Sequence, residues 1–452
     1  MSQAQESNRN QELLQFVQEA FDANNLAAIR DWLEQSHPSQ IADLLESLPV
    51  GTRDELWLHI SEDLEGDVLS HASTAVRTGL LEGMEPKQVA AATEGLESDD
   101  IADILQDLPE PVADEVLGSM AAQDRERVEQ VIDYPEDTAG GLMNADTVSV
   151  RSDVDIDVVL RYLRLLGDVP SHTDSLMVVD RLNTYLGILP LSEVVTADPD
   201  RRVGEIMTVD IDPIAADTAD NDVALLFEQR DLLSAAVVDA DGKLIGRITV
   251  DDVVDVIREE NDRTLLSAAG LDEEHDIFEP ILMSTRRRAL WLAINLATAF
   301  LAAWVIGFFD ATIEQLVALA ILMPVVASMG GIAGTQTLII VIRGLAQGQV
   351  GRANAKSIML RETTVGVING LIWSLVVALI AALWFGDWRL GGVIGAAIVI
   401  NLLVGALFGA AIPLILKRLR VDPALAGGVI LTTLTDVVGF VAFLGLATIF
   451  LI

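Results

Sequence analysis

The sequence contains no cysteine, and this absence removes several classes of function at once. Disulfides, zinc fingers, iron–sulfur clusters and cysteine nucleophiles all need that side chain. The five histidines are scattered without the spacing of metal ligands. The chain also lacks a nucleophile–base pair, a phosphate-binding loop and metallohydrolase spacing, so we expect that it is not an enzyme. Its start has no basic and apolar leader, which predicts a cytosolic N-terminus.

Basic residues are few in the first part of the chain, where acidic residues dominate. The whole chain holds 68 acidic and 29 basic residues, of which six acidic and eleven basic ones follow residue 280. The preceding segment therefore carries a formal charge of about −44, which repels nucleic acid and attracts cations. We expect metal ions or basic proteins as partners, and no nucleic acid. An acidic surface that only aids solubility is the alternative.

Residues 8–133 are predicted to form consecutive short amphipathic helices, separated by proline and glycine. The segment IADLLESLP at 41–49 recurs as IADILQDLP at 101–109. Both copies keep their aliphatic residues at helical spacing, which indicates a helical repeat. We therefore predict an all-α superhelical N-terminal domain.

Residues 134–260 carry a second repeat of a different kind. The segment MVVD at 177–180, followed by LG at 186–187, returns as AVVD at 236–239 and IG at 245–246. Short β-branched strands alternate with helices in each unit. The pattern resembles a tandem pair of CBS motifs, which implies an α/β domain that binds adenosine nucleotides or ions in the cleft between its units.

Residues 284–452 hold five apolar stretches, each with the roughly 20 residues that a spanning helix needs. Basic residues gather before the first stretch and in every second loop after it. The positive-inside rule then places the N-terminus in the cytosol, and an odd number of spans places the C-terminus outside. The sequence predicts a multi-pass protein of the cytoplasmic (inner) membrane, with spans at 289–309, 316–342, 363–385, 391–416 and 424–452.

One ionisable residue, Asp436, falls within these predicted spans. A carboxylate at the bilayer centre costs about 2.5 to 3.5 kcal/mol on insertion scales, so it seldom lacks a role. Neighbouring threonines add hydroxyl oxygens, which suit hydrated Mg²⁺, and two copies across a dimer axis would supply two negative charges. The alternative is an aspartate that only hydrogen-bonds to another helix.

The second predicted span is rich in glycine, with the segment MPVVASMGGIAGTQT at 323–337. Pro324 frees a backbone carbonyl and the glycines expose others, which favours a backbone-lined pore. The same small residues would also allow close helix packing, so both interpretations stand.

Together these features resemble the MgtE family of magnesium channels over nearly the whole chain. The second span reads P-x5-GG-x2-G-x-Q, Asp422-Pro-Ala precedes the fifth span, and the fifth span contains T-x2-D-x2-G around Asp436. The resemblance implies a homodimer in the lipid bilayer that takes up Mg²⁺ selectively. It also implies an acidic linker or plug helix at 252–283, joining the soluble domains to a five-helix transmembrane pore domain at 284–452.

The resemblance further assigns residues to sites. The pore carboxylate is Asp436, with Gly331, Thr335 and Thr432 nearby. Carboxylates that sense cytosolic Mg²⁺ carry over onto Asp99, Asp103, Asp231, Asp252, Asp255, Glu260 and Asp422. ATP would contact Glu193, Thr249 and Asp252. The sequence departs from the family pattern at Ile332, where many members have asparagine, and at Arg263 and Thr264, where the family has acidic residues.

We expect electrostatic gating, in which clustered carboxylates repel one another until Mg²⁺ bridges them and the linker helix closes the pore. A passive channel is favoured, because the sequence shows no second buried ionisable group for a relay. The alternatives are a coupled divalent cation exchanger and a non-transporting membrane sensor with a CBS nucleotide site. Oxygen ligands alone do not separate Mg²⁺ from Mn²⁺, Co²⁺ or Ni²⁺.

Overall fold

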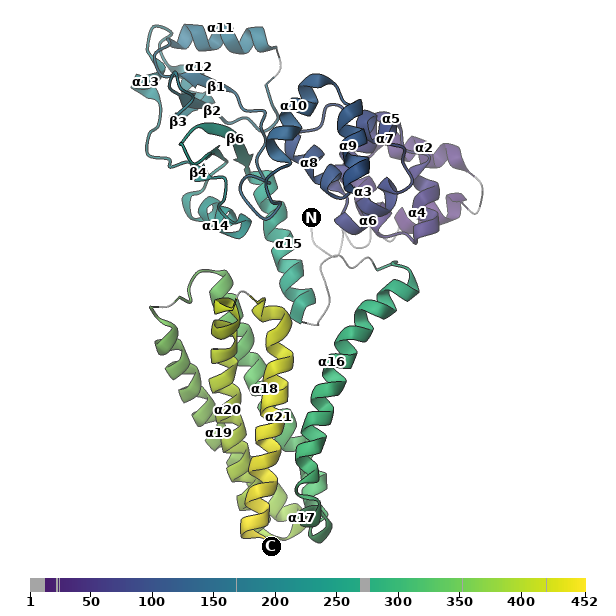
Figure 1. Cartoon of the computed structure of the whole chain (residues 1–452), viewed down its shortest axis with the longest axis vertical. Helices are drawn as coiled ribbons and strands as arrows, with labels where there is room; N and C mark the ends of the chain where they lie inside the picture. Colours follow the sequence, from purple (N-terminus) through teal and green to yellow (C-terminus); the bar gives the residue numbers. More distant parts are fainter. Residues whose placement is uncertain are drawn as a thin grey trace. The chain divides into compact units, whose positions relative to one another are not determined.

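The computed structural model describes residues 13–21, 23, 25–167, 169–268, 277–351, 353–419 and 421–452. The chain forms two compact units, and each is described by itself (Figure 1). The first unit comprises Met1–Asn261 and Glu274–Glu279, and the second comprises Asp262–Glu273 and Pro280–Ile452.

The first unit begins with short helices, as the sequence predicts. The repeated segments form α3 and α8, and each copy buries its four aliphatic positions, 41, 42, 44 and 45 in α3 and 101, 102, 104 and 105 in α8. The helical repeat is therefore confirmed in three dimensions. After a helical segment at 13–21, the helices are α2 (Leu26–Gln35), α3 (Pro38–Glu46), α4 (Val50–Trp57), α5 (Glu62–His71), α6 (Thr74–Leu81), α7 (Pro86–Ala92), α8 (Ser98–Gln106), α9 (Glu110–Ser119) and α10 (Ala122–Val131).

Two small sheets of equal topology follow, as the second repeat predicts. In each sheet the first strand is parallel to the second and the second is antiparallel to the third. The hydroxyls of Ser175 and Ser234, which are equivalent in the two repeats, lie 3.3 Å apart. The elements are β1 (Ser149–Arg151), α11 (Ile156–Leu166), β2 (Ser175–Val179), β3 (Tyr185–Pro190), α12 (Leu191–Thr196), α13 (Val203–Ile206), β4 (Ile214–Ala215), α14 (Asp220–Arg230), β5 (Ser234–Val238) and β6 (Leu244–Thr249).

The predicted linker helix corresponds to α15, Val250–Ala268. It starts directly after β6, where the backbone N–H of Thr249 donates to Asp252 Oδ2 at 3.0 Å, as in a helix capping box. Residues 269–276 of the predicted linker lie outside the described residues. A turn then precedes the first helix of the second unit.

The second unit contains five helices that are long and apolar enough to cross a membrane, which confirms the predicted number of spans. Two of them begin eight residues earlier than predicted, at Ile281 in place of 289 and at Ala355 in place of 363. The reason is that polar and basic residues continue a helix into the headgroup region, where hydropathy no longer detects it. The helices are α16 (Ile281–Gly307), α18 (Ala318–Ala346), α19 (Ala355–Phe385), α20 (Trp388–Arg418) and α21 (Pro423–Phe450), with the short α17 (Asp310–Gln315) after α16.

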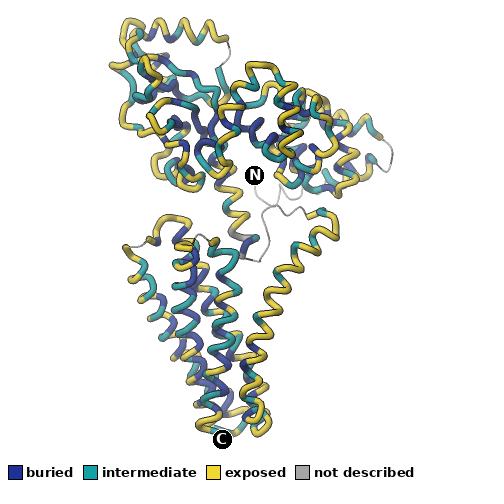
Figure 2. The backbone as a smooth tube through the Cα atoms, in the orientation of Figure 1, coloured by how far each residue is buried: buried dark blue, intermediate teal, exposed yellow. Residues whose placement is uncertain are grey.

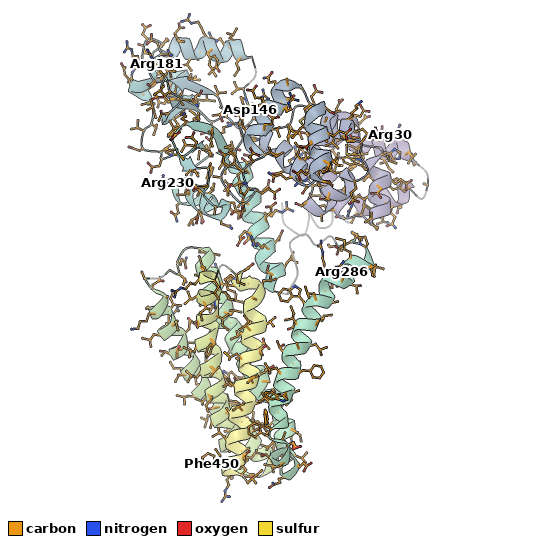
Figure 3. All side chains as sticks on the ribbon, viewed as in Figure 1. Arg30, Asp146, Arg181, Arg230, Arg286 and Phe450 are labelled. Carbon is orange, nitrogen blue, oxygen red and sulfur yellow. The ribbon has the colours of Figure 1, made fainter. Side chains whose placement is uncertain are left out.

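Helix α20 forms the centre of this second unit. Half of its most apolar window is buried inside the protein, against 11% for α16, and Figure 2 shows the same contrast along the two helices. Arg286, near the start of α16, and Phe450, at the end of α21, lie at opposite ends of the bundle (Figure 3). This arrangement agrees with an odd number of crossings.

Candidate functional site

Helices α18 and α21 line an open groove of about 450 Å³ in the second unit. Asp436 and Thr432 come from α21, where their spacing of four residues places them on one helix face. Gly331, Thr335 and Gln336 come from α18. The groove therefore brings together the four residues that the family resemblance assigns to the pore.

The polar groups of this groove are oxygen donors of the hard type. They are the carboxylate of half-buried Asp436, the amide of Gln336, and the hydroxyls of Ser328, Thr335 and Thr432. A water molecule occupies about 30 Å³ in the liquid, so the groove has room for an ion that keeps its water shell. Mg²⁺ dehydrates reluctantly and is usually held through one or two carboxylates and several waters. Ile332 also lines the groove, so no asparagine amide stands at that position.

The glycine-rich segment of α18 both packs against a neighbouring helix and lines the groove. Gly330 and Gly334 pack against α20, where a Cβ added at Gly405 would lie 2.8 Å from the carbonyl oxygen of Gly330. Gly331, one residue further, lies on the groove with no atom within 4 Å of its own added Cβ. Close helix packing thus places α18 beside α20 while leaving backbone exposed to the groove.

A second group of candidate residues lies in the first unit, at the start of α8 and of α15. Burial raises the pKa of Asp99 well above its usual range, and the nearby charges of Asp252, Asp100 and Glu97 add to this effect. Burial, followed by the charge of Asp252, raises the pKa of Asp100 to about 7. Burial raises the pKa of Asp252 to about 7 against hydrogen bonds from Thr249 that lower it. We call Glu97, Asp99, Asp100, Asp103 and Asp252 the acidic cluster.

Asp103 extends this acidic cluster along α8. Burial raises its pKa to about 7, although Arg77 lowers it. Arg77 is already engaged, since its Nε lies 2.5 Å from Asp107 Oδ2 in a largely buried ion pair. Asp255 on α15 also has a raised pKa, caused by burial and partly offset by Arg258.

Other predicted sensing residues lie outside the acidic cluster. Asp231 is an exposed residue with a left-handed backbone at the end of α14. Glu260 Oε2 accepts a hydrogen bond from Asn221 Nδ2 at 3.3 Å. In the second unit, Asp422 caps α21 by accepting from the backbone N–H of Ala424 at 2.7 Å. Among the described residues, no three His, Asp or Glu side chains are arranged to hold one ion.

Glu97 and Asp100 are not among the predicted sensing residues, although the run ESDD at 97–100 is visible in the sequence. Two adjacent aspartates in the first turn of a helix look like favourable charges at its N-terminus. Only the fold shows that Asp99 is buried, that Asp100 is partly buried and that Asp252 lies near both. The signal that could have found them is the comparison with the other repeat, which has no acidic residue at the equivalent positions 37–40.

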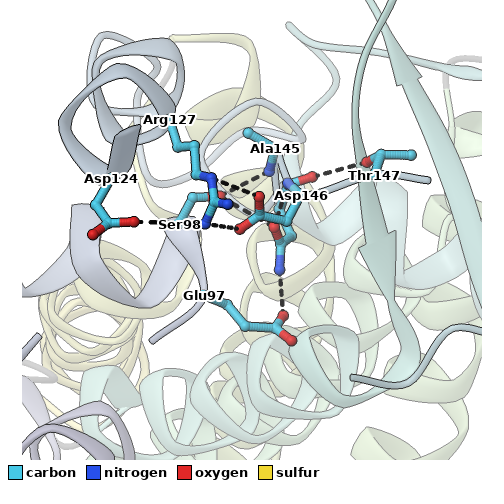
Figure 4. Close-up of polar contacts among 8 residues, drawn as sticks. Glu97, Ser98, Asp124, Arg127, Ala145, Asp146 and Thr147 are labelled. Atoms are coloured by element: carbon cyan, nitrogen blue, oxygen red, sulfur yellow. Dashed lines mark hydrogen bonds and ion pairs between the residues drawn. The ribbon is translucent and has the colours of Figure 1, made fainter. Parts of the chain in front are cut away.

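A polar network joins the helical repeats to the first strand region (Figure 4). The backbone N–H of Ala145 donates to Ser98 Oγ at 2.8 Å, and Ser98 Oγ donates to Asn144 Oδ1 at 3.2 Å. Glu97 accepts from the Asn144 amide. Arg127 Nε lies 3.0 Å from Asp146 Oδ1. This network fixes the start of α8, which carries Asp99, Asp100 and Asp103 of the acidic cluster.

The predicted nucleotide contacts come from both CBS units, Glu193 from the first and Thr249 and Asp252 from the second. Thr249 is buried, and its hydroxyl donates to Asp251 at 2.5 Å and to Asp252 at 3.0 Å. Glu193 is exposed on α12 of the first CBS unit. A ribose hydroxyl at this site would therefore compete with the bonds that Thr249 already makes.

Comparison with known proteins matches three regions of the chain to family models. They are a divalent cation transporter domain, MgtE (323–446), the MgtE intracellular N domain (36–137) and a CBS domain (203–259). The chain is 31% identical over 441 residues to the magnesium transporter MgtE of Thermus thermophilus, covering 96% of this chain and 98% of that one. It is 27% identical over 428 residues to the magnesium transporter MgtE of Bacillus subtilis, covering 94% of each.

One similar solved structure is described as the cytosolic domain of the Mg²⁺ channel MgtE in complex with ATP. It is 33% identical and covers 53% of this chain and 98% of its own, with a TM-score of 0.49.

Proposed function

The chain belongs to the MgtE family, and on that premise we propose that it carries Mg²⁺ across the cytoplasmic membrane through a pore that two copies share. The observation that carries this proposal is the groove, in which Asp436 and Thr432 of α21 face Gly331 and Thr335 of α18. A carboxylate surrounded by hydroxyl and backbone oxygens attracts a hydrated divalent cation more strongly than a monovalent one. The helical and CBS domains would lie in the cytosol, with the C-terminus outside.

The exposure of the groove supports a homodimer. Asp436 is only half-buried, and Thr432 and Gln336 beside it are exposed. In a lone subunit this face would meet lipid, at a cost of about 2.5 to 3.5 kcal/mol for the carboxylate. A second copy related by a twofold axis would cover the groove and double its charge.

The acidic cluster supports regulation by the transported ion. Two unit charges about 4 Å apart repel by roughly 1 to 4 kcal/mol at effective dielectrics of 80 to 20. A nearly complete two-state switch needs about 5.5 kcal/mol, so a few bridged pairs suffice. Helix α15 belongs to the first unit up to Asn261 and to the second unit from Asp262. A cation that neutralises the carboxylates at the start of α15 would therefore act on a helix that continues into the second unit.

A coupled exchanger is the second candidate, and Glu362 favours it. This residue precedes the predicted third span, but it lies inside α19 and is 5% exposed. The second unit therefore has a buried carboxylate in addition to the half-buried Asp436 of the groove. The preference for a passive channel rests on the expectation that no such second group exists. Flux driven by a pH gradient without a Mg²⁺ gradient would favour exchange.

ATP is a proposed ligand of the CBS pair, through Glu193, Thr249 and Asp252. Asp252 is also a member of the acidic cluster, so nucleotide and Mg²⁺ would act on the same carboxylate. Calorimetric titration of ATP into the full chain, with Asp252→Asn as the comparison, tests this assignment. Equal heats from both proteins would remove Asp252 from the nucleotide site.

The direct test of transport is Mg²⁺ uptake into proteoliposomes that contain the purified full chain. We expect uptake that follows the Mg²⁺ gradient, increases with an inside-negative potential and falls when Mg²⁺ is present on the cytosolic side. Empty liposomes are the control. Uptake no faster than into empty liposomes, with folded protein present, would leave the membrane sensor as the remaining alternative.

A further inference from the structure

A buried amide, Asn401, lies in the middle of α20. It is fully buried, and its Nδ2 donates to the carbonyl oxygen of Val326 on α18 at 2.8 Å. This acceptor fixes which end of the amide carries the nitrogen. The other end, Oδ1, is buried and has no hydrogen-bond partner among the described residues.

Two glycines form a notch around this amide. A Cβ added at Gly439 of α21 would lie 2.7 Å from Asn401 Nδ2 and 3.0 Å from its Cγ. A Cβ added at Gly330 of α18 would collide with the same amide group. Real Cβ atoms do not approach so closely, so each glycine is needed for the amide to fit. Three helices therefore meet at one side chain.

The same notch stands directly behind the groove. Gly330 precedes Gly331, and Gly439 follows Asp436 by about one helical turn. The lining residues of the groove come from α18 and α21 alone, so α20 supports it from behind. Contact of both α18 and α21 with Asn401 thus sets the distance between the two helices that line the groove.

Packing alone gives no reason for an amide at this position. A buried acceptor without a partner destabilises the fold, whereas an apolar side chain of similar size carries no such penalty. Positions where a chain departs from the locally favourable residue are concentrated at functional sites. The unpaired Oδ1, the hydrogen bond to α18 and the two-sided notch all fall within one turn of the groove residues.

We propose that Asn401 is a positioning residue for the ion groove, which holds the Gly331 wall of α18 at a fixed distance from the Asp436 wall of α21. This inference rests on the proposed transport function. The Asn401 side chain touches no ion itself, and it acts through α18 and α21, the two helices that pack against it. Removing the amide should shift the walls and change how strongly the groove holds a divalent cation.

The test compares Asn401→Leu with Asn369→Leu in reconstituted full-length protein. Asn369 is an exposed asparagine on α19, so its replacement is the matched control. Thermal unfolding in detergent reports stability, while Mg²⁺ uptake over a range of concentrations and its inhibition by Co²⁺ report the groove. We expect Asn401→Leu to fold, to raise the half-saturating Mg²⁺ concentration by about tenfold and to change the Co²⁺ inhibition, because misplaced ligands lose affinity.

If folded Asn401→Leu has the wild-type half-saturating Mg²⁺ concentration for uptake, the proposal is overturned, whether or not the stability of the variant falls. Should Asn401→Leu fail to fold, Gly439→Ala displaces the amide without deleting it, and the same shift is expected. A normal uptake curve from folded Gly439→Ala would also overturn the proposal. Absence of uptake by the wild-type protein contradicts the proposed function instead, so the two failures are distinguishable.

Discussion

Gly330 and Gly331 of α18 are adjacent, yet they serve different purposes. Successive helical residues point about 100° apart, so one faces α20 while its neighbour faces the groove. The added Cβ at Gly331 would meet nothing, whereas the one at Gly330 would strike the Asn401 amide. A glycine-rich segment is therefore a mixture of packing positions and exposed backbone, and the sequence alone does not separate them.

The packing positions predict a difference between two glycines of the same helix. A Cβ at Gly405 would lie 2.8 Å from the Gly330 carbonyl oxygen and 3.2 Å from the Gly334 nitrogen, and neither backbone atom can yield without shifting α18. Gly405→Ala should destabilise the protein by about 1–3 kcal/mol. Gly392, also on α20, has nothing within 4 Å of its added Cβ, so Gly392→Ala should be neutral or slightly stabilising.

Thermal unfolding of both alanine variants in the same detergent measures this difference. Each kcal/mol corresponds to roughly 2–4 °C for a domain of 150–250 residues. Equal unfolding temperatures for Gly405→Ala and Gly392→Ala would show that α18 and α20 are not packed as closely as described.

At the scale of elements, α3 and α8 are two copies of one repeat with different charges. Both bury the same aliphatic positions, but positions 97, 99 and 100 before and within α8 are acidic, while positions 37, 39 and 40 before and within α3 are not. The fold of the repeat therefore does not need these carboxylates. We propose that the acidic cluster serves ion sensing and not the packing of the repeat.

The raised pKa values predict how the stability of the first unit depends on pH in the absence of Mg²⁺. Burial raises the pKa of Asp100, Asp103 and Asp252 to about 7 in the folded protein. Between about pH 4 and 7 the folded state thus holds more protons than the unfolded one, so stability falls as pH rises through that window. In EDTA we expect slower proteolysis of the first unit at pH 6 than at pH 8, and added Mg²⁺ should restore protection from proteolysis at pH 8.

A matched pair of variants isolates the acidic cluster in this measurement. Asp103→Asn removes a partly buried carboxylate with a raised pKa and should make proteolysis at pH 8 slower than in wild type. Asp43→Asn changes the equivalent position of the other repeat, which is exposed, and should have no effect. Proteolysis of Asp103→Asn with the wild-type pH dependence would argue against the repulsion that we describe.

The sequence predicts more of the elements than of their contacts. The five spans, both repeats and the groove residues Asp436, Thr432 and Gly331 follow from periodicity, hydropathy and family resemblance. Asn401 and Glu362 could not be found in this way, because an isolated polar residue in or beside an apolar helix gives no sign of which side it faces. The burial of Asp100 likewise depends on α15, which is distant in sequence.

The proposed pore needs two copies of the whole molecule. One groove with a single half-buried carboxylate is open on its outer side, and a second copy would close it. We predict that native mass spectrometry in mild detergent finds a dimer of this 452-residue chain at concentrations where uptake is observed. A monomer that retains uptake after reconstitution as isolated subunits would rule out the shared pore.

Mg²⁺ uptake by Asp436→Asn is the decisive measurement for the proposed pore. The amide keeps the shape and hydrogen bonding of the carboxylate but removes one charge from each half of the pore, so uptake should collapse while folding persists. Asp387→Asn is the control, because Asp387 caps α20 by accepting from Arg389 N–H at 2.8 Å and asparagine caps equally well. Our account predicts uptake near background for Asp436→Asn and near wild type for Asp387→Asn. Wild-type uptake by Asp436→Asn at normal expression would contradict it.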